Sequence, residues 1–146
     1  MSAPWTMRPV RIDDAATIAR HRYADAGAQE DLVAYERWVA VRIERGTYGG
    51  VFAEADGAVV AGAGAVLLDW GPTRGESTGL RARIVNIYTA PDWRRRGIAR
   101  NLVQEVIRRC QKRDVQVFSL ASTDDSAALY ESLGFMRFPQ EMILRP

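Results

Sequence analysis

The sequence has few of the residues that build disulfide frameworks and metal sites. Its 146 residues include one cysteine, Cys110, and one histidine, His21. A single cysteine excludes an internal disulfide, and His21 has no plausible metal-binding partner in the sequence. We therefore expect no metal, and we expect the chain to fold in a reducing compartment, the cytoplasm.

Long hydrophobic runs and an excess of charge are also absent. The N-terminal residues MSAPWTMRPVRIDD contain no apolar stretch like a signal peptide, and the longest apolar segment, Ala58 to Leu68, is interrupted by glycines and too short to span a bilayer. Twenty basic against eighteen acidic residues give a formal charge of +2. We expect no membrane association, and nucleic acid is the least favoured partner.

The composition is that of an ordinary folded protein. Hydrophobic residues make up 47% and charged residues 26% of the chain, both near globular averages. A chain of this length can bury a sizeable core as one unit. We expect a single domain over residues 1–146.

The hydrophobic pattern predicts strands and helices in a particular order. Strands are expected at Thr6 to Val10, Tyr48 to Glu54, Ala58 to Leu68, Arg81 to Thr89 and Val115 to Leu120, and as a final pair from Phe135 onward. Helices are expected from a cap at Asp13 or Asp14 to Tyr23, from Gln29 to Arg45, from Gly97 to Arg113, and from a cap at Asp124 or Asp125 to Leu133. This order predicts an α/β (α+β) fold with a central mixed sheet flanked by helices.

The most informative segment is Asn86 to Arg100, where a strand runs into a basic turn and a helix opens at Gly97. The first N–H groups of a helix have no internal partner and lie at the positive end of its dipole, so they suit a phosphate. Glycine lets the backbone approach an anion closely. Taken alone, the segment is more simply a solvated basic turn at a helix start.

Two motifs carry a family resemblance. Arg94-x-x-Gly97-x-Ala99 resembles the Arg/Gln-x-x-Gly-x-Gly/Ala signature of the GNAT superfamily of N-acetyltransferases, and Ala128-Leu-Tyr-Glu-Ser-Leu-Gly-Phe135 is similar to a later helix of that family. The order of elements agrees over nearly the whole chain. The resemblance implies a GNAT-like fold that transfers an acetyl group from acetyl-coenzyme A to a primary amine of a small molecule or protein.

The resemblance also implies a site. Coenzyme A would be bound by Ile87, Tyr88, Thr89, Arg94, Arg95, Arg96, Gly97, Ile98, Ala99, Arg100 and Thr123. The strands around Tyr88 and Phe118 would separate to admit it. Thr123 stands where many relatives have asparagine. Tyr130 would be the catalytic proton donor to the departing thiolate, since a phenol has a pKa of about 10.

The general base is left unassigned. Glu36, Asp69 and Glu76 are available, but each is more simply a surface charge. His21 is more simply structural than catalytic, whereas Trp38 and Trp70 are candidates to line an acceptor pocket. A non-catalytic acyl-coenzyme A sensing module is the alternative function, and the acceptor, the use of other acyl groups and a homodimer all stay open.

Overall fold

The computed structural model describes residues 4–24 and 31–146. The strands are β1 (Thr6–Pro9), β2 (Tyr48–Ala55), β3 (Ala58–Asp69), β4 (Leu80–Thr89) and β5 (Val117–Ser119). The α-helices are α1 (Ala15–Arg22), α2 (Leu32–Arg45), α3 (Ile98–Gln111) and α4 (Asp124–Ser132), and short 3-10 helices cover Ile12–Asp14 and Pro91–Trp93. The strands form one sheet in the order β1-β2-β3-β4-β5, antiparallel except for the parallel pair β4 and β5. The predicted mixed sheet is confirmed.

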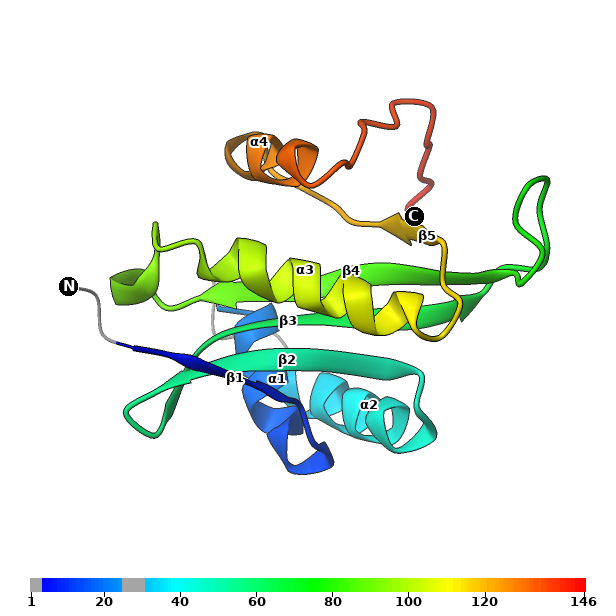
Figure 1. Cartoon of the computed structure of the whole chain (residues 1–146). Helices are drawn as coiled ribbons and strands as arrows, with labels where there is room; N and C mark the ends of the chain where they lie inside the picture. The colour runs from blue at the N-terminus through cyan, green and yellow to red at the C-terminus, as the bar shows by residue number, and fades with distance from the viewer. Residues whose placement is uncertain (1–3, 25–30) are drawn as a thin grey trace.

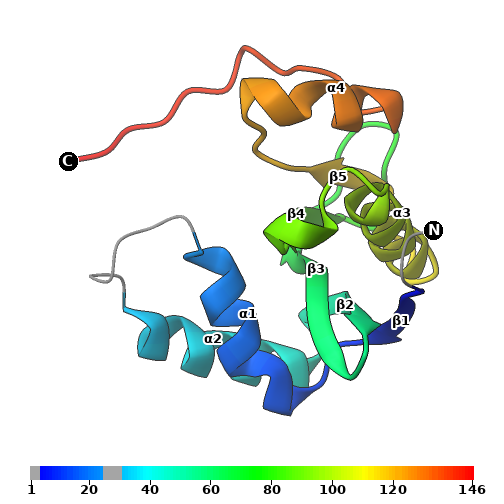
Figure 2. The ribbon, with the colours of Figure 1, turned by 90° about the vertical axis from the view of Figure 1, so that its left-hand side faces the viewer.

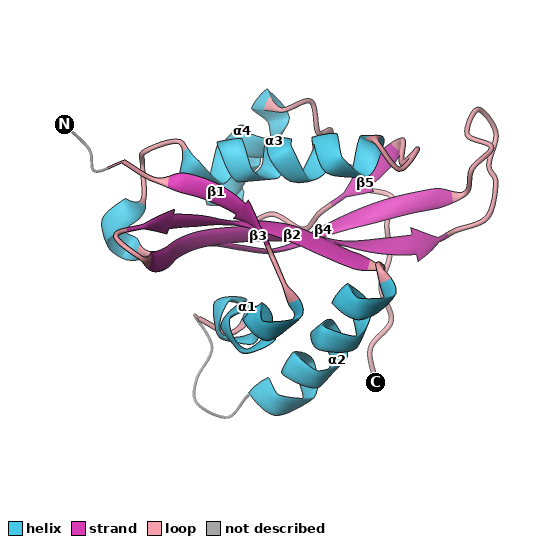
Figure 3. Cartoon of the chain, turned by 60° about the horizontal axis from the view of Figure 1, so that its bottom comes forward, coloured by secondary structure: helices cyan, strands magenta, loops and turns pink. Residues whose placement is uncertain are grey.

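The helices cover both faces of the sheet. Helices α1 and α2 pack on one face, and α3 and α4 lie on the other (Figures 1 and 3). Figure 2, turned by 90°, shows the same separation, with β4 between α1 and α4. Two apolar clusters result, one between α1, α2 and the sheet and one between the sheet, α3 and α4.

The larger cluster explains the amphipathic pattern of α3. The buried side chains of this helix are Ile98, Leu102, Val103, Val106 and Cys110, the stripe that the sequence predicts. They pack on a sheet face that β3 builds largely from alanine, which lets the helix approach closely. Each fully buried aliphatic side chain contributes about 1.5–3 kcal/mol. Burial also raises the pKa of the Cys110 thiol, so this cysteine is an unreactive core residue.

Strand β4 is interrupted by a bulge at Asn86. Opposite β3, Val85 pairs with Gly64 and Tyr88 with Gly62, so the register shifts between them. Asn86 has a φ of 57°, a left-handed conformation that asparagine tolerates better than most residues. The bulge bends the strand just before Ile87, Tyr88 and Thr89.

Three turns form as the sequence predicts. Gly46 ends α2 with a φ of 75°, and Gly97 begins α3 with a φ of 76°. Asp56 and Gly57, with φ values of 52° and 77°, make the tight turn between β2 and β3. The start predicted for α2 at Gln29, and the loop predicted at Ala26 to Ala28, lie outside the described residues.

Asp14 occupies the predicted N-cap position of α1, but its carboxylate does not bond to the first turn, and the cap predicted for α4 at Asp124 or Asp125 is wrong. The Asp14 carboxylate accepts hydrogen bonds from the Arg8 guanidinium, at 2.8 and 2.9 Å, and from the Arg11 N–H, so it ties the 3-10 helix to β1 instead of capping α1. This pairing lowers the pKa of Asp14. The cap of α4 is Thr123, which forms a reciprocal capping box with Ser126.

The predicted strand pair beyond Phe135 is also wrong. Residues 135–146 form no strand, and Met136, Met142 and Leu144 are 89%, 94% and 96% exposed. Apolar residues alone do not make a strand, because each strand also needs a neighbour for its backbone hydrogen bonds. β5 spans only three residues and pairs with β4, but not with this tail.

We expect Gly64→Ala to lower the free energy of unfolding by about 1–3 kcal/mol, because a β-carbon there would lie 2.1 Å from the Tyr48 hydroxyl oxygen. Urea unfolding measures the change. Gly49→Ala is the matched control on the neighbouring strand, since no atom lies within 4 Å of its β-carbon position. Equal destabilisation by both substitutions would contradict the packing described here.

Candidate active site

The end of β4 presents main-chain groups without a neighbouring strand on one side. β4 pairs with β5 only at Arg81, Ala82 and Arg83, and Phe118 lies within this paired part. Beyond Ser119 the chain runs to α4, away from β4 (Figure 1). The separation thus begins after Ser119, and it leaves the β5-facing edge of β4 open to a ligand from Ile84 to Thr89.

The arginine turn that follows β4 is shaped by its own side chains. The Arg94 Nε donates to the Thr89 carbonyl at 3.0 Å. The Arg96 Nη2 donates to the Asp92 carbonyl at 2.9 Å, and its guanidinium lies 4.5 Å from the centre of the Trp93 ring. Two of the predicted anion-binding arginines therefore hold the turn in shape.

The N-terminus of α3 is open for an anion. No atom lies within 4 Å of the position that a β-carbon would occupy at Gly97. Ile98 is buried and anchors the helix, while the first-turn N–H groups of Ile98, Ala99 and Arg100 have no partner within the helix. Arg95, with a φ of 63°, is exposed beside them. Backbone donors and positive charge thus converge at this point.

Tyr130 joins the same region from α4. Only 7% of the Tyr130 surface is exposed, and the residue belongs to the same apolar cluster as Ile98. Ile87 packs against that cluster. Phe135 lies edge-on to the Tyr130 ring, with 6.2 Å between the ring centres. Within the described residues the Tyr130 hydroxyl has no hydrogen-bond partner and is not sealed from solvent. Burial raises the pKa of Tyr130, so the phenol stays protonated at neutral pH.

The remaining predicted residues support α4. Thr123 caps the helix through its bond with Ser126, and Arg100 donates to the Ser132 hydroxyl. The Arg100 contact joins the first turn of α3 to the end of α4. It ties the tyrosine-bearing helix to the turn that is predicted to bind an anion.

Sequence reasoning missed a polar network on the opposite face of β4. The Asn86 amide donates to the Tyr35 hydroxyl at 2.9 Å and to the Tyr48 hydroxyl at 3.0 Å. Its oxygen accepts from Arg22 at 3.1 Å. The one available signal was an asparagine within a strand otherwise rich in β-branched residues, since asparagine is depleted in strands.

His21 also lies at this bulge. Its ring stacks on Tyr88 with 4.4 Å between the ring centres. The centre of the Phe52 ring lies 5.5 Å from that of His21. Burial, with the nearby charge of Arg20, lowers the pKa of His21 to about 4. The imidazole is therefore neutral at pH 7.

The carboxylates considered as bases differ in their surroundings. Glu76 was expected at the surface, but it is buried and accepts from the Thr78 and Gly79 N–H groups and from the Thr78 hydroxyl, which lowers its pKa. It organises its own loop. Asp69 is exposed and accepts from the Gly71 N–H, and Glu36 is half-buried on α2.

The two tryptophans considered for an acceptor pocket also differ. The centre of the Trp38 ring lies 5.5 Å from the centre of the Tyr35 ring, so Trp38 borders the polar network. Trp70 is 59% exposed and stacks on Arg81, with the guanidinium 4.7 Å from the ring centre. Only Trp38 is thus joined to the network at the bulge by a ring contact among the described residues.

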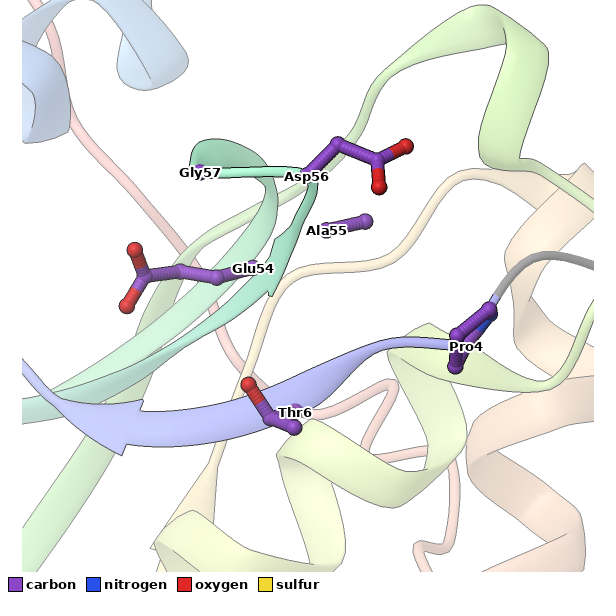
Figure 4. A pocket seen from close by; sticks show the side chains of 6 residues that line it. All are labelled: Pro4, Thr6, Glu54, Ala55, Asp56 and Gly57. Atoms are coloured by element: carbon purple, nitrogen blue, oxygen red, sulfur yellow. The ribbon is translucent and has the colours of Figure 1, made fainter.

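Two surface hollows lie away from these residues. One, of about 310 Å³, is at the β2–β3 turn, and Figure 4 shows its lining residues: Pro4, Thr6, Glu54, Ala55, Asp56 and Gly57. The other, of about 230 Å³, lies between β2, β3 and the second half of α3. Neither includes a predicted site residue, so the candidate site is defined by β4, α3 and α4.

Residues 4–24 and 31–146 contain neither a metal-binding cluster nor a membrane-spanning helix. In this part of the chain, no group of three or more histidine, cysteine, aspartate or glutamate side chains could hold a metal ion. No helix of that part is long and apolar enough to cross a bilayer.

An open β4 edge beside a glycine-started helix and a buried tyrosine are the features that the sequence predicts for an acyl-coenzyme A-dependent transferase. The model of the acetyltransferase (GNAT) family matches residues 12–135, so the chain belongs to this family. It is an N-acetyltransferase that uses acetyl-coenzyme A. No curated protein matches the sequence.

Solved structures share the fold. A GCN5-related N-acetyltransferase from Ralstonia eutropha is 27% identical, with a TM-score of 0.84 over 98% of this chain and 99% of that one. An acetyltransferase from Clostridium acetobutylicum, solved with acetyl-coenzyme A, is 20% identical, with a TM-score of 0.87 over 97% and 96%. Glucosamine-6-phosphate N-acetyltransferase from Arabidopsis thaliana is 13% identical, with a TM-score of 0.76 over 97% and 98%.

The lowered pKa of His21 predicts an acid-dependent loss of stability. The unfolded chain binds the proton with a pKa of 6.5, above the folded value of about 4. The contribution of neutral His21 is therefore complete above pH 6.5, is lost as the pH falls toward 4, and changes no further below. We expect the free energy of unfolding to fall by about 1–2 kcal/mol in total over this range, because the ring is partly exposed and solvent weakens the effect.

Urea unfolding at pH 7 and pH 4.5 checks this loss. His21→Phe retains a ring beside Tyr88 but does not titrate, and His21→Gln serves if the larger ring does not fit. The loss between the two pH values should be smaller in either variant than in the wild type. An identical loss in all three proteins would show that His21 does not contribute.

Proposed function

We propose that the chain acts as one domain over residues 1–146 that acetylates a primary amine of a small molecule or protein, with its donor bound between β4, α3 and α4. One observation supports this most directly. Ile98 from α3 and Tyr130 from α4 belong to a single apolar cluster, and Ile87 from β4 packs against it. The strand edge, the helix N-terminus and the proposed acid therefore share one packed layer although they are far apart in sequence.

The donor is bound mainly by the backbone. Main-chain groups of Ile87, Tyr88 and Thr89 bind the acetyl and pantetheine portion along the open edge of β4. The pyrophosphate lies at the start of α3, where it is bound by residues Gly97, Ile98, Ala99 and Arg100 with Arg95, on a turn shaped by Arg94 and Arg96. Thr123 supports this side by fixing the start of α4.

The reaction needs an amine nucleophile, an oxyanion donor and an acid. The neutral amine attacks the thioester carbon, and a main-chain N–H at the bulge stabilises the negative oxygen. The C–N bond forms first, with the carbonyl electron pair moving to oxygen; this pair then returns, the C–S bond breaks, and its electron pair goes to sulfur. The sulfur takes the Tyr130 proton, and the phenolate regains a proton from the new amide nitrogen through water.

The open N-terminus of α3 is tested by Gly97→Ala. An added methyl group there clashes with no protein atom but blocks an approaching anion, so we expect acetyl-coenzyme A to bind about tenfold more weakly, measured by calorimetry. Gly57→Ala is the matched control, because its φ of 77° and open surroundings impose the same strain in the hollow of Figure 4. Weaker binding in Gly57→Ala alone would place the donor in that hollow.

The role of Tyr130 is tested by Tyr130→Phe. We expect kcat to fall about 100-fold or more, with acetyl-coenzyme A affinity within about twofold of wild type, because only the proton donor is removed. Thiol release with a panel of amines measures the rate. Wild-type turnover also separates an enzyme from the sensing module considered above, and an unchanged kcat in Tyr130→Phe would assign the acid elsewhere.

A further inference from the structure

We infer that the acceptor amine carries an anionic group, a carboxylate or a phosphate, a few bonds from its nitrogen, and that Arg22 binds this group. The inference rests on the proposed function, because it names the class of amine for the same site. It arises from the polar network at the bulge, which the donor does not use.

Arg22 lies beside the proposed point of reaction. Its Nη1 donates to the Asn86 side-chain oxygen at 3.1 Å. Asn86 directly precedes Ile87 and Tyr88, whose backbone binds the acetyl group under the proposal. A group bound to Arg22 is therefore adjacent to an amine that attacks the thioester.

The Arg22 guanidinium is held in place and retains donors. It lies over the Tyr35 ring, 4.5 Å from its centre, and 5.9 Å from the centre of the Tyr23 ring. A guanidinium has five N–H groups, and among the described residues only Asn86 accepts from Arg22. A planar, oriented guanidinium suits two-point binding of a carboxylate or phosphate.

The charge around Arg22 favours an anion over a second cation. Several other arginines bind carboxylates, as Arg8 binds Asp14 and Glu54, but Arg22 forms no ion pair with any residue of 4–24 or 31–146. Its described contacts are with the Tyr23 and Tyr35 rings and the Asn86 amide, none of which is a carboxylate. A polycationic amine would find no compensating charge among them.

The geometry restricts the distance between the two groups of the acceptor. The amine must reach the backbone at Ile87 while the anion reaches a guanidinium hydrogen-bonded to the preceding residue. An α-amino acid meets this requirement, as does a short amine phosphate. The shared chemistry is an amine and an anion on one small molecule, and the test separates the two sources.

Matched pairs of acceptors test the inference: phenylalanine against 2-phenylethylamine, and O-phosphoethanolamine against ethanolamine. The anionic member of at least one pair should have a kcat/KM at least tenfold higher, mainly through KM. Arg22→Gln keeps a donor for Asn86 but removes the charge, and it should bring that ratio to about one. Arg22→Lys should retain part of the ratio.

Arg20→Gln is the matched control. Arg20 lies on the same helix, is exposed and bonds to Thr17, so its loss should preserve the wild-type ratio. Equal rates for the two members of both pairs in the wild type would overturn the inference. So would an equal fall for both members in Arg22→Gln, which would make Arg22 a support for Asn86.

A binding measurement keeps the two proposals distinct. Phenylalanine and O-phosphoethanolamine are titrated calorimetrically onto the wild type saturated with coenzyme A, and onto Arg22→Gln. Binding that Arg22→Gln weakens at least tenfold supports the inference even if no amine is acetylated, an outcome that would end the proposed function alone. Absence of binding by both compounds overturns the inference even if other amines are acetylated.

Discussion

The left-handed backbone at Asn86 is the constraint on which the site depends. A regular strand would continue its pairing and turn each successive residue to the opposite face, but the bulge interrupts the ladder at this residue. Left-handed backbone is costly for most side chains. Here the cost is offset by three hydrogen bonds, from Arg22 and to Tyr35 and Tyr48, which come from three different elements. The distortion at the proposed reaction centre is thus maintained by α1 and α2 together with the neighbouring strand β2.

The two faces of the sheet contribute different residues to the candidate site. The face covered by α3 and α4 supplies the glycine-started helix and Tyr130, both anchored in one apolar cluster. The face covered by α1 and α2 supplies the network around Asn86, together with His21 stacked on Tyr88. β4 carries Ile87 of the first group and both Asn86 and Tyr88 of the second. Under the proposed function, the acceptor therefore meets the donor where the β4 backbone is exposed.

The sequence predicted well where a local signal decides the structure. Gly46 and Gly97 have the left-handed backbone expected at helix boundaries, and the stripe of α3 is buried as its period indicates. It failed where the outcome depends on distant partners. Asp14 binds Arg8 instead of a helix end, and the residues after Phe135 find no strand to pair with.

The candidate site also has one part that the sequence predicts and one part that it does not. The donor half was predictable because an arginine–glycine turn and a helix start are continuous in sequence. Asn86 and Arg22 are 64 positions apart, and their contact exists only once α1 packs beneath β4. The roles assigned to the donor residues and to Tyr130 stay predictions, because geometry alone does not measure binding or proton transfer.

The surroundings of Arg22 bear on the missing base. An alkylammonium with a pKa of about 10.4 must lose its proton before attack, and a nearby anion on the same molecule raises that pKa further. Pairing of the anion with Arg22 cancels this effect. Burial raises the pKa of the adjacent Tyr48 phenol, so it stays neutral and offers the ammonium no counter-charge. An ammonium that lies near the Arg22 guanidinium without a counter-charge of its own releases its proton more readily. On this argument the acceptor surroundings lower the demand for a strong base, and water suffices to carry the proton away.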